Sequence, residues 1–401
     1  MNPPSASTQW TYNVRQIIRF DHTEEHVAPD SLKLGFACAW DNPPEKTWSH
    51  APWTIRKCLL ERTDVVDLGL EWSTPVRSAL RGLGAYRHNG TWRTQWTRHP
   101  VTLSLAGRQL RAAERRLRPD VVLQFGDLAR MDTPYLLYQD LSFDIVMEHL
   151  DPATGRSVQA PGLSLDDLKR LRDRQLSIYA EASGVLAMSH WLADHLVRVT
   201  GLPEEKVHVV LPGANSLPAV APTTRREAPR KRLLFVGIDF HRKAGDLVVA
   251  AAQILRREVD PGIELTIVGP PEWPLPGPVP DGVRFLGKLP PAEVRPLYAE
   301  HDVLVMPSRF EAYGLAFIEA LAHGIPCVAR RAYAMTEIIE PGVNGDLVDG
   351  DDPEVLARTI AGVLGNDEIY TRILTRAEAL IQHYTWDRVA DDIVRIAKTA
   401  R

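Results

Sequence analysis

Short apolar runs alternate with longer amphipathic segments along most of the chain. Helical patterns separate most of these runs. Strands that alternate with helices build parallel sheets that helices cover on both faces. The pattern therefore predicts an α/β fold made of doubly wound sheets. The expected strands occupy residues 33–40, 121–125, 135–138, 184–188, 207–211, 233–237, 264–268, 283–286, 302–306 and 326–329.

Several helices begin with recognisable signals. Ser164 and Asp167 have the spacing of a capping box, in which side chains and backbone N–H groups bond reciprocally. Asp352 precedes a proline and a glutamate, the order typical of an N-cap with an acidic first turn. Further helices are expected over 246–257 and, at the end of the chain, over 384–397.

The length of the chain indicates two domains. It has 401 residues, more than one hydrophobic core normally supports. Residues 216–232 are rich in Pro, Ala, Thr and Arg and show no apolar period, as linkers do. We predict an N-terminal Rossmann-like domain over 1–215 and a C-terminal Rossmann-like domain over 216–383. A closing helix over 384–401 is expected to return to the N-terminal domain.

Composition narrows the class of protein. The chain is 44% hydrophobic and 24% charged with a net charge of −4, so nothing global argues for nucleic acid binding, although a local basic groove is compatible with these values. The three cysteines show neither metal-ligand spacing nor a disulfide framework. Membrane spans need about 18 apolar residues, which no run reaches, and residues 1–30 lack a signal-peptide core. We expect a cytoplasmic protein and leave peripheral membrane contact open.

Two carboxylates, Glu311 and Glu319, flank Gly314 after the apolar run 302–306. The pattern places Glu311 in the loop at a strand's carboxyl end and Glu319 inside the following helix. Open α/β sheets bind ligands at that edge, and a helix N-terminus offers N–H groups to an anion. Each carboxylate could instead be a solvated charge. Apolar residues surround Glu319, however, and a charge in that setting needs a partner.

A second candidate site follows the run 233–237. Gly237 permits close approach of the backbone, and Arg242 and Lys243 stand where the loop enters the next helix. Guanidinium and ammonium groups suit a diphosphate there, although a solvated basic pair is the commoner explanation. The dinucleotide fingerprint G-x-G-x-x-G is absent from this segment.

Three weaker signals remain. Asp140 follows the run 135–138 and is a candidate acid, with capping of the next helix as the favoured alternative. Asp349 and Asp351 form an Asp-x-Asp pattern that fits a turn better than a metal site, and no metal is predicted. A basic helix could face a membrane or an acceptor, or simply complement its own dipole, through Arg108, Arg111, Arg115, Arg116 and Arg118.

The order of these motifs resembles family 4 of the retaining glycosyltransferases, the glycosyl transferases group 1, which have the two-domain GT-B fold. The N-terminal half is similar more loosely, through 138–143, 185–189 and 206–215. In the C-terminal half the resemblance covers most of 233–365. It rests there on Gly237, Arg242, Lys243, Gly269, Gly287, Pro307, Ser308, Phe310, Glu311, Gly314, Glu319, 324–326, Glu337, 342–345 and Asp352.

The resemblance implies a role for each matching residue. Glu311 would contact hydroxyls of the donor sugar, and Glu319 would accept hydrogen bonds from the ribose hydroxyls. Lys243, with Arg242, would neutralise the diphosphate leaving group, and Asp140 falls near a catalytic position. The other donor-binding positions implied are Gly237, Gly287, Lys288, Ala312, Tyr313, Gly314 and Leu315.

The resemblance also implies the reaction: transfer of a hexose or related sugar from a nucleoside-diphosphate sugar, with retention of configuration, without a metal or another cofactor. The acceptor is open. A small molecule, a glycan or a lipid is expected before a nucleic acid, and the sequence predicts no oligomeric state. Two alternatives are an epimerase or phosphorylase on the same fold and a non-catalytic nucleotide-binding subunit.

The chain departs from the family pattern in three places. Ile238 and Asp239 stand where many members have an arginine, which Arg242 would replace. Ala244 stands where they have a glycine, with Gly245 following it. The loop 40–53 lacks the usual glycine pair. Because that loop faces the acceptor in this fold, we expect an unusual acceptor.

Overall fold

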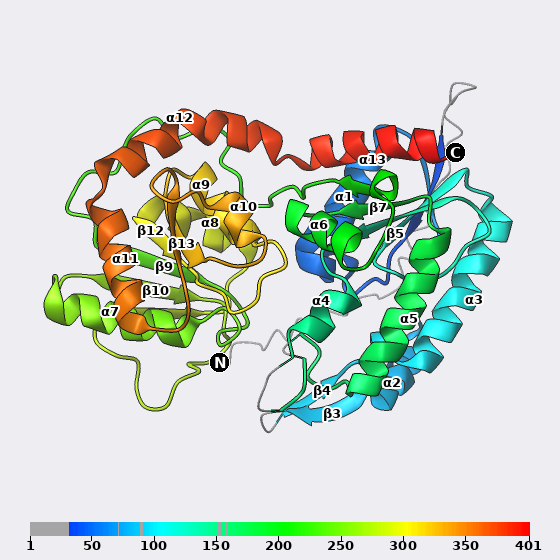
Figure 1. Ribbon diagram of the computed structural model, residues 1–401, viewed down its shortest axis with the longest axis horizontal. Coiled ribbons are helices and arrows are strands. Elements are labelled where there is room, and N and C mark those ends of the chain that lie inside the picture. Colours follow the sequence, from blue (N-terminus) through cyan, green and yellow to red (C-terminus); the bar gives the residue numbers. More distant parts are fainter. Residues whose placement is uncertain (1–31, 71, 89–90, 151–153, 158) are drawn as a thin grey trace, which may run out of the picture. The chain divides into compact units, whose positions relative to one another are not determined.

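The fold was obtained as a computed structural model, which describes residues 32–401 except 71, 89–90, 151–153 and 158. These residues form one compact unit. It contains two six-stranded parallel sheets and a separate two-stranded hairpin, with helices between the strands (Figure 1). The predicted doubly wound α/β fold is therefore confirmed.

The first sheet has the strand order β2-β1-β5-β6-β7-β8, and all its pairs are parallel. Alternate residues of one strand enter different apolar clusters: Leu34 and Phe36 pack with α1 and α13, and Ala37 packs on the opposite face. Helices thus cover both faces, as the apolar runs predicted. The strands are β1 (Lys33–Ala37), β2 (Asp64–Asp67), β5 (Val121–Phe125), β6 (Tyr135–Gln139), β7 (Gly184–Ala187) and β8 (Val207–Val209).

The second sheet has the order β11-β10-β9-β12-β13-β14, the strand order of a Rossmann fold. The direction of winding changes between β9 and β12, so the loops that follow these two strands flank the switch point, where such sheets bind ligands. All its pairs are parallel. The strands are β9 (Arg232–Val236), β10 (Glu264–Val268), β11 (Val283–Gly287), β12 (Val303–Val305), β13 (Cys327–Arg330) and β14 (Gly345–Val348).

The hairpin consists of β3 (Ala85–His88) and β4 (Thr91–Thr94), which pair only with each other among the described residues. Short 3-10 helices span Pro44–His50, Trp96–Arg98 and Glu204–Lys206. The α-helices are α1 (Ala51–Leu60), α2 (Thr74–Leu83), α3 (Pro100–Leu117), α4 (Phe143–Glu148), α5 (Leu165–Glu181), α6 (His190–Arg198), α7 (Gly245–Glu258), α8 (Pro291–Glu300), α9 (Leu315–Ala322), α10 (Met335–Ile338), α11 (Pro353–Gly365), α12 (Asp367–His383) and α13 (Trp386–Ala400).

The predicted helix starts are confirmed. Ser164 Oγ accepts the N–H of Asp167 at 3.1 Å, and the Asp167 carboxylate accepts the N–H of Ser164 at 3.0 Å. Asp352 Oδ1 accepts the N–H of Glu354 at 2.8 Å. The elements β2, β3, β4 and β14 were not predicted, and the first apolar run ends as a strand at Ala37 rather than at residue 40.

Helix α13 lies at the end of the chain but packs against α1 and the first sheet. Trp386, Val389 and Ile393 share one apolar cluster with Leu34 and Phe36. Figure 1 shows this helix in red beside α1. The limits of the two predicted domains stay a prediction. Among the described residues, none of the helices has the length and apolarity that a membrane-spanning segment requires.

Candidate functional site

Gly237 follows β9 and lets Lys243 fold back over the end of the strand. A Cβ atom on Gly237 would lie 2.3 Å from Cδ of Lys243, so Lys243 would have to leave this position if Gly237 were replaced. The Lys243 ammonium donates to Oε2 of Glu311 at 2.8 Å. Because β9 and β12 are neighbours in the sheet, this bond joins the two loops at the switch point.

The Glu311 carboxylate is only 8% exposed and lies among donors. Its Oε2 also accepts from Ser308 Oγ at 3.2 Å and lies 3.9 Å from the Arg242 guanidinium. Burial raises the pKa of Glu311, but the charges of Lys243 and Arg242 and the two hydrogen bonds outweigh burial, so the pKa lies below its ordinary value. Glu311 is therefore ionised at neutral pH.

Arg242 is held against the same loops. Its Nε donates to Asp239 Oδ2 at 3.2 Å, and its Nη1 donates to the carbonyl of Phe310 at 2.8 Å. The structure thus brings three predicted residues, Arg242, Lys243 and Glu311, into one group, which we call the switch-point cluster. They come from segments almost seventy residues apart in sequence.

The loop after Glu311 enters α9 at Gly314, whose φ of +101° is tolerated by glycine alone at little cost. Leu315 begins the helix, and the N–H groups of its first turn have no acceptor within the helix. Tyr313 is buried, and its hydroxyl donates to the hydroxyl of Tyr384 at 3.0 Å. Ala312 is half-buried. The predicted stretch therefore places a helix N-terminus directly after the switch-point cluster.

Glu319 has partners that the sequence did not indicate. Its Oε1 accepts the backbone N–H groups of Asn215 at 3.3 Å and Ser216 at 3.1 Å, and its Oε2 accepts the Tyr298 hydroxyl at 2.9 Å. Burial raises the pKa of Glu319, and these hydrogen bonds offset only part of the rise. A carboxylate has about four acceptor positions, and protein donors fill three of them here. The ribose contact of Glu319 stays a prediction.

Gly287 and Lys288 lie further along the sheet edge. Gly287 ends β11 with a φ of +70°, and its carbonyl accepts the N–H of Gly269 at 2.8 Å. Lys288 is exposed. Within the described residues, no hydrogen bond or ion pair links either one to the switch-point cluster. Their contact with a nucleotide base stays a prediction.

Asp140 follows β6 in the first sheet. Burial raises its pKa, its backbone hydrogen bond and the charge of Arg98 oppose the rise, and the charge of Glu311 adds to it. The carboxylate is thus electrostatically coupled to the switch-point cluster. The alternative of a helix cap is wrong, because the side chain that caps α4 belongs to Ser142, whose Oγ accepts the N–H of Ile145 at 3.3 Å.

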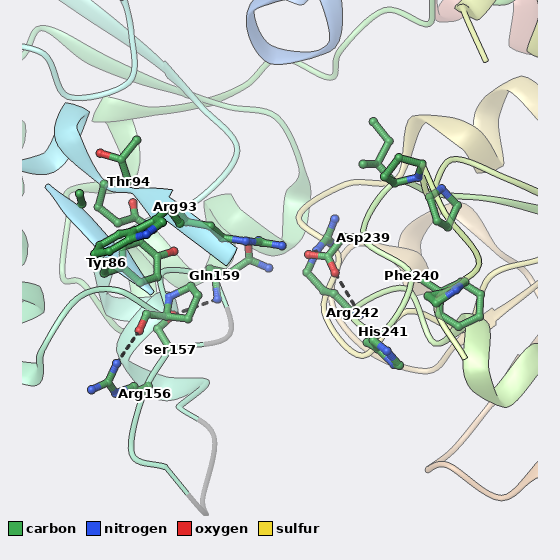
Figure 2. A pocket seen from close by; sticks show the side chains of 18 of the residues that line it. Tyr86, Arg93, Thr94, Arg156, Ser157, Gln159, Asp239, Phe240, His241 and Arg242 are labelled. Atoms are coloured by element: carbon green, nitrogen blue, oxygen red, sulfur yellow. Dashed lines mark hydrogen bonds and ion pairs between the residues drawn. The ribbon is translucent and has the colours of Figure 1, made fainter. Parts of the chain in front are cut away.

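A cavity of about 1550 Å³ opens beside the loop between β9 and α7. Described residues of the segments 81–95 and 154–161 line one side, and residues 238–242 and 270–274 line the other. Figure 2 shows Arg93 of β4 reaching into the cavity from the side opposite Asp239 and Arg242. Small-ligand pockets usually measure roughly 300–1000 Å³, so this cavity has room for more than one small molecule.

Arg309 was missed by the sequence reading. Its guanidinium donates to both Asp246 oxygens at 2.8 and 2.9 Å and to Asp351 at 2.8 Å, and Arg330 also pairs with Asp351. Arg309 therefore links the loop that carries Glu311 to the first turn of α7. Asp351 forms ion pairs with both arginines. The described residues contain no group of three or more His, Cys, Asp and Glu side chains that could hold a metal ion.

Asn215 was predicted only as a domain limit. In the structure its side-chain Nδ2 donates to the carbonyl of Ser49 at 2.8 Å, and its Oδ1 accepts the indole N–H of Trp386 at 3.0 Å. With its backbone bond to Glu319, Asn215 joins three distant segments. A small polar residue two positions after Gly213 is the sole sequence signal for this position.

The loop 40–53 and Ala244 show how the departures from the family pattern are accommodated. Trp48, Ser49 and His50 have φ values of +43°, +53° and +73°, and Ala244 has +60°. Side chains other than glycine adopt this left-handed region at an energetic cost. The backbone thus adopts the glycine conformation where glycine is missing. The link to an unusual acceptor stays a prediction.

The basic helix is α3, which runs to Leu117 with Arg118 as its C-cap. Its arginines are exposed or half-buried, and Arg115 lies 3.6 Å from Asp132. The contact of this surface with a membrane or an acceptor stays a prediction.

Relatives of known sequence match the chain over part of its length. Residues 230–366 match the family described as Glycosyl transferases group 1. A D-inositol 3-phosphate glycosyltransferase of Salinispora arenicola is 31% identical over 248 residues, which cover 55% of this chain and 55% of that protein. One of Corynebacterium efficiens is 29% identical over 251 residues, covering 57% and 58%. The chain thus spans little more than half the length of the curated relatives it matches.

Solved structures match over nearly the whole chain. Sucrose-phosphate synthase of Thermosynechococcus elongatus has a TM-score of 0.66 at 17% identity, with 92% of this chain and 98% of that chain covered. At this identity the likeness concerns the fold. The family match, the sequence relatives and the shared architecture lead to one assignment. Residues 230–366 match the glycosyl transferases group 1, and the chain has the GT-B fold.

Proposed function

We propose that this protein transfers a sugar from a nucleoside-diphosphate sugar to an acceptor, with retention of configuration and without a metal ion. The observation that carries the proposal is the switch-point cluster. Lys243 and Arg242 meet Glu311 at the point of the second sheet where open α/β sheets bind ligands. Retention rests on the resemblance to this family.

The cluster suits the charge that develops in such a reaction. When the bond between the anomeric carbon and the diphosphate oxygen breaks, negative charge accumulates on the leaving diphosphate. Lys243 and Arg242 supply two cations, and the N-termini of α7 and α9 supply N–H groups at the same sheet edge. Preorganised positive groups of this kind stabilise the transition state more than the ground state.

Glu311 suits the sugar rather than the phosphate. Its Oε2 is bonded to Lys243 and Ser308, while Oε1 accepts no hydrogen bond from a described residue. An ionised carboxylate oxygen is a strong acceptor for a sugar hydroxyl. Asp140, which responds to the charge of Glu311, would orient the acceptor or the sugar from the first sheet. Neither carboxylate is assigned as a nucleophile.

The donor assignment is testable by thermal unfolding. Among UDP-, GDP-, ADP- and TDP-sugars, at least one should raise the melting temperature in proportion to the logarithm of its concentration. Lys243→Ala should lower the affinity for that ligand by about tenfold or more, because hydrogen bonds to charged groups contribute about 1.5–3 kcal/mol. Lys231→Ala is the matched control, since the Lys231 ammonium pairs with Asp260 at 2.6 Å outside the cluster. Unchanged affinity in Lys243→Ala would contradict the prediction that Lys243 binds the diphosphate.

The stereochemistry is testable once a donor and an acceptor are found. Proton NMR of the first product formed, before any mutarotation, should show the anomeric configuration of the donor. A product of the opposite configuration would disprove retention. Full turnover after exhaustive treatment with a chelator is expected, and a loss that added Mg²⁺ or Mn²⁺ restores would disprove metal independence.

A further inference from the structure

The cavity opposite the loop between β9 and α7 is positively charged although the chain is not. Its charged lining consists of four arginines, Arg81, Arg93, Arg156 and Arg242, against Asp239 and Glu272, which gives four minus two, a net charge of +2. The chain as a whole carries −4. The lining of the cavity is therefore rich in positively charged side chains, although the net charge of the chain is negative.

The arginines on the two sides of the cavity differ in their partners. Arg242 is paired with Asp239 at 3.2 Å. Arg81, Arg93 and Arg156 form no ion pair with any residue that the structure describes; Arg156 donates to the carbonyl of Pro161 at 3.2 Å. A guanidinium group that has no carboxylate partner and faces a cavity can bind an anion that enters it.

The hairpin presents Arg93 together with an aromatic side chain. Tyr86 and Arg93 are directly opposite each other in the β3–β4 pairing, so their side chains share one face of the hairpin. The Tyr86 ring packs on Gly162, where a Cβ atom would lie 2.4 Å from the ring. This contact holds the hairpin against the chain at Gly162. Figure 2 shows Arg93 directed into the cavity from this face. Trp92, 75% exposed, also lines the cavity, although its side chain leaves the opposite face of the hairpin.

We propose that this cavity binds the acceptor through an anionic oxygen group, a phosphate or a carboxylate, held by Arg93. The planar guanidinium group matches such anions bidentately, and the exposed Trp92 in the lining suits the face of a sugar ring. The donor stays on the switch-point cluster, with Arg242 between the two sites. The identity of the ligand as an acceptor rests on the proposed function, whereas the anion site itself does not.

The test uses the full chain with its donor site filled. Protein saturated with the nucleoside diphosphate that binds best is titrated calorimetrically with glucose 6-phosphate, with glucuronate and with glucose. The phosphate and the carboxylate arms separate the two sources of the anion. At least one of the anions should bind about tenfold more tightly than glucose, the difference expected for a charge-assisted contact.

The variants separate a specific site from a general charge effect. Arg93→Gln should abolish the preference for the anion, and Arg93→Lys should keep part of it, because lysine retains the charge without the planar fork. Arg295→Gln, the same change at an exposed arginine of α8, should leave the preference intact. An unchanged melting temperature and nucleotide affinity in Arg93→Gln show that the fold and the donor site are intact.

The outcomes of the two proposals are distinct. Equal binding of all three sugars, binding of none, or a preference that survives Arg93→Gln overturns the anion site and leaves the donor site standing. If no nucleoside diphosphate binds, the proposed function fails, and the same titrations without nucleotide still decide the anion site.

Discussion

Glu311 and Glu319 belong to one motif yet have pKa values displaced in opposite directions. Both carboxyl groups are buried, which raises the pKa of each. Glu311 faces two cations, which outweigh its burial, whereas the donors of Glu319 are neutral N–H and O–H groups. The charge of the partner therefore decides which carboxylate is held ionised.

Glu319→Gln should change the pH dependence of stability. A raised pKa in the folded state means that the contribution of Glu319 is fully present below about pH 4, its ordinary range, and is lost as pH rises through the folded pKa. Glutamine keeps an acceptor oxygen for both N–H groups but does not titrate. Urea unfolding should therefore favour the variant progressively, relative to wild type, between pH 4 and pH 7. Parallel curves for the two proteins would contradict the assignment.

Glu311→Gln should show the opposite trend. A lowered pKa in the folded state means that the contribution of Glu311 is present above its ordinary pKa and is lost as pH falls through the folded pKa. The variant leaves the Lys243 ammonium without its carboxylate, at a cost of about 3–5 kcal/mol at neutral pH that shrinks in acid. Denaturant unfolding of Glu311→Gln with and without Lys243→Met measures the coupling, and simple additivity would disprove it.

The sequence predicted which loops form the site, but not which atoms meet there. Glu311, Gly314 and the start of α9 follow from one continuous segment, so spacing and turn chemistry locate them. The bond from Lys243 to Glu311 crosses 68 residues and that from Asn215 to Glu319 crosses 104. Such contacts depend on strand order, which a single sequence does not encode in any local pattern.

Helix α7 begins after Ala244, which occupies a left-handed conformation at φ +60° and is fully buried. A non-glycine residue there costs about 1–2 kcal/mol. Ala244→Gly relieves that strain and loses about 0.8 kcal/mol of methyl burial, plus up to about 1 kcal/mol of chain entropy. The net change in unfolding free energy should therefore stay within about 1 kcal/mol.

The matched control for this prediction is Ala251→Gly within the same helix. Ala251 is equally buried but has ordinary helical geometry, so its replacement should cost about 2 kcal/mol from helix propensity and lost burial. Chemical denaturation of both variants makes the comparison. Equal costs at the two positions would show that Ala244 is not strained.

The unpredicted elements share weak local signals. β2 is Asp-Val-Val-Asp, too short and too acidic at its ends to stand out, and β14 begins with a glycine. β3 and β4 are polar strands without an apolar stripe, because they cover no core. The Asn-Gly dipeptide at 89–90 was the available signal, since it is the commonest sequence between two hairpin strands.

At the scale of the whole molecule, α13 closes the first sheet by docking on a glycine. A Cβ atom on Gly213 would lie 2.5 Å from the ring of Trp386, so Gly213→Ala should cost about 1–3 kcal/mol through overpacking. Gly362→Ala, in α11 with nothing within 4 Å of the added atom, should instead stabilise the protein by about 1 kcal/mol. Melting temperatures that move the same way in both variants would exclude this docking.

The return of α13 also reverses the order in which a nascent chain can finish its two halves. Proteins usually fold as they leave the ribosome, with N-terminal parts first. Here the cluster around Leu34 and Phe36 includes Trp386, Val389 and Ile393, whereas the cluster of the second sheet ends earlier, with buried residues up to 373 and partly buried ones up to Tyr384. The half that is synthesised second can therefore mature first. Until then the earlier half exposes the part of its sheet that α13 covers, beside α1, and a chaperone could bind there.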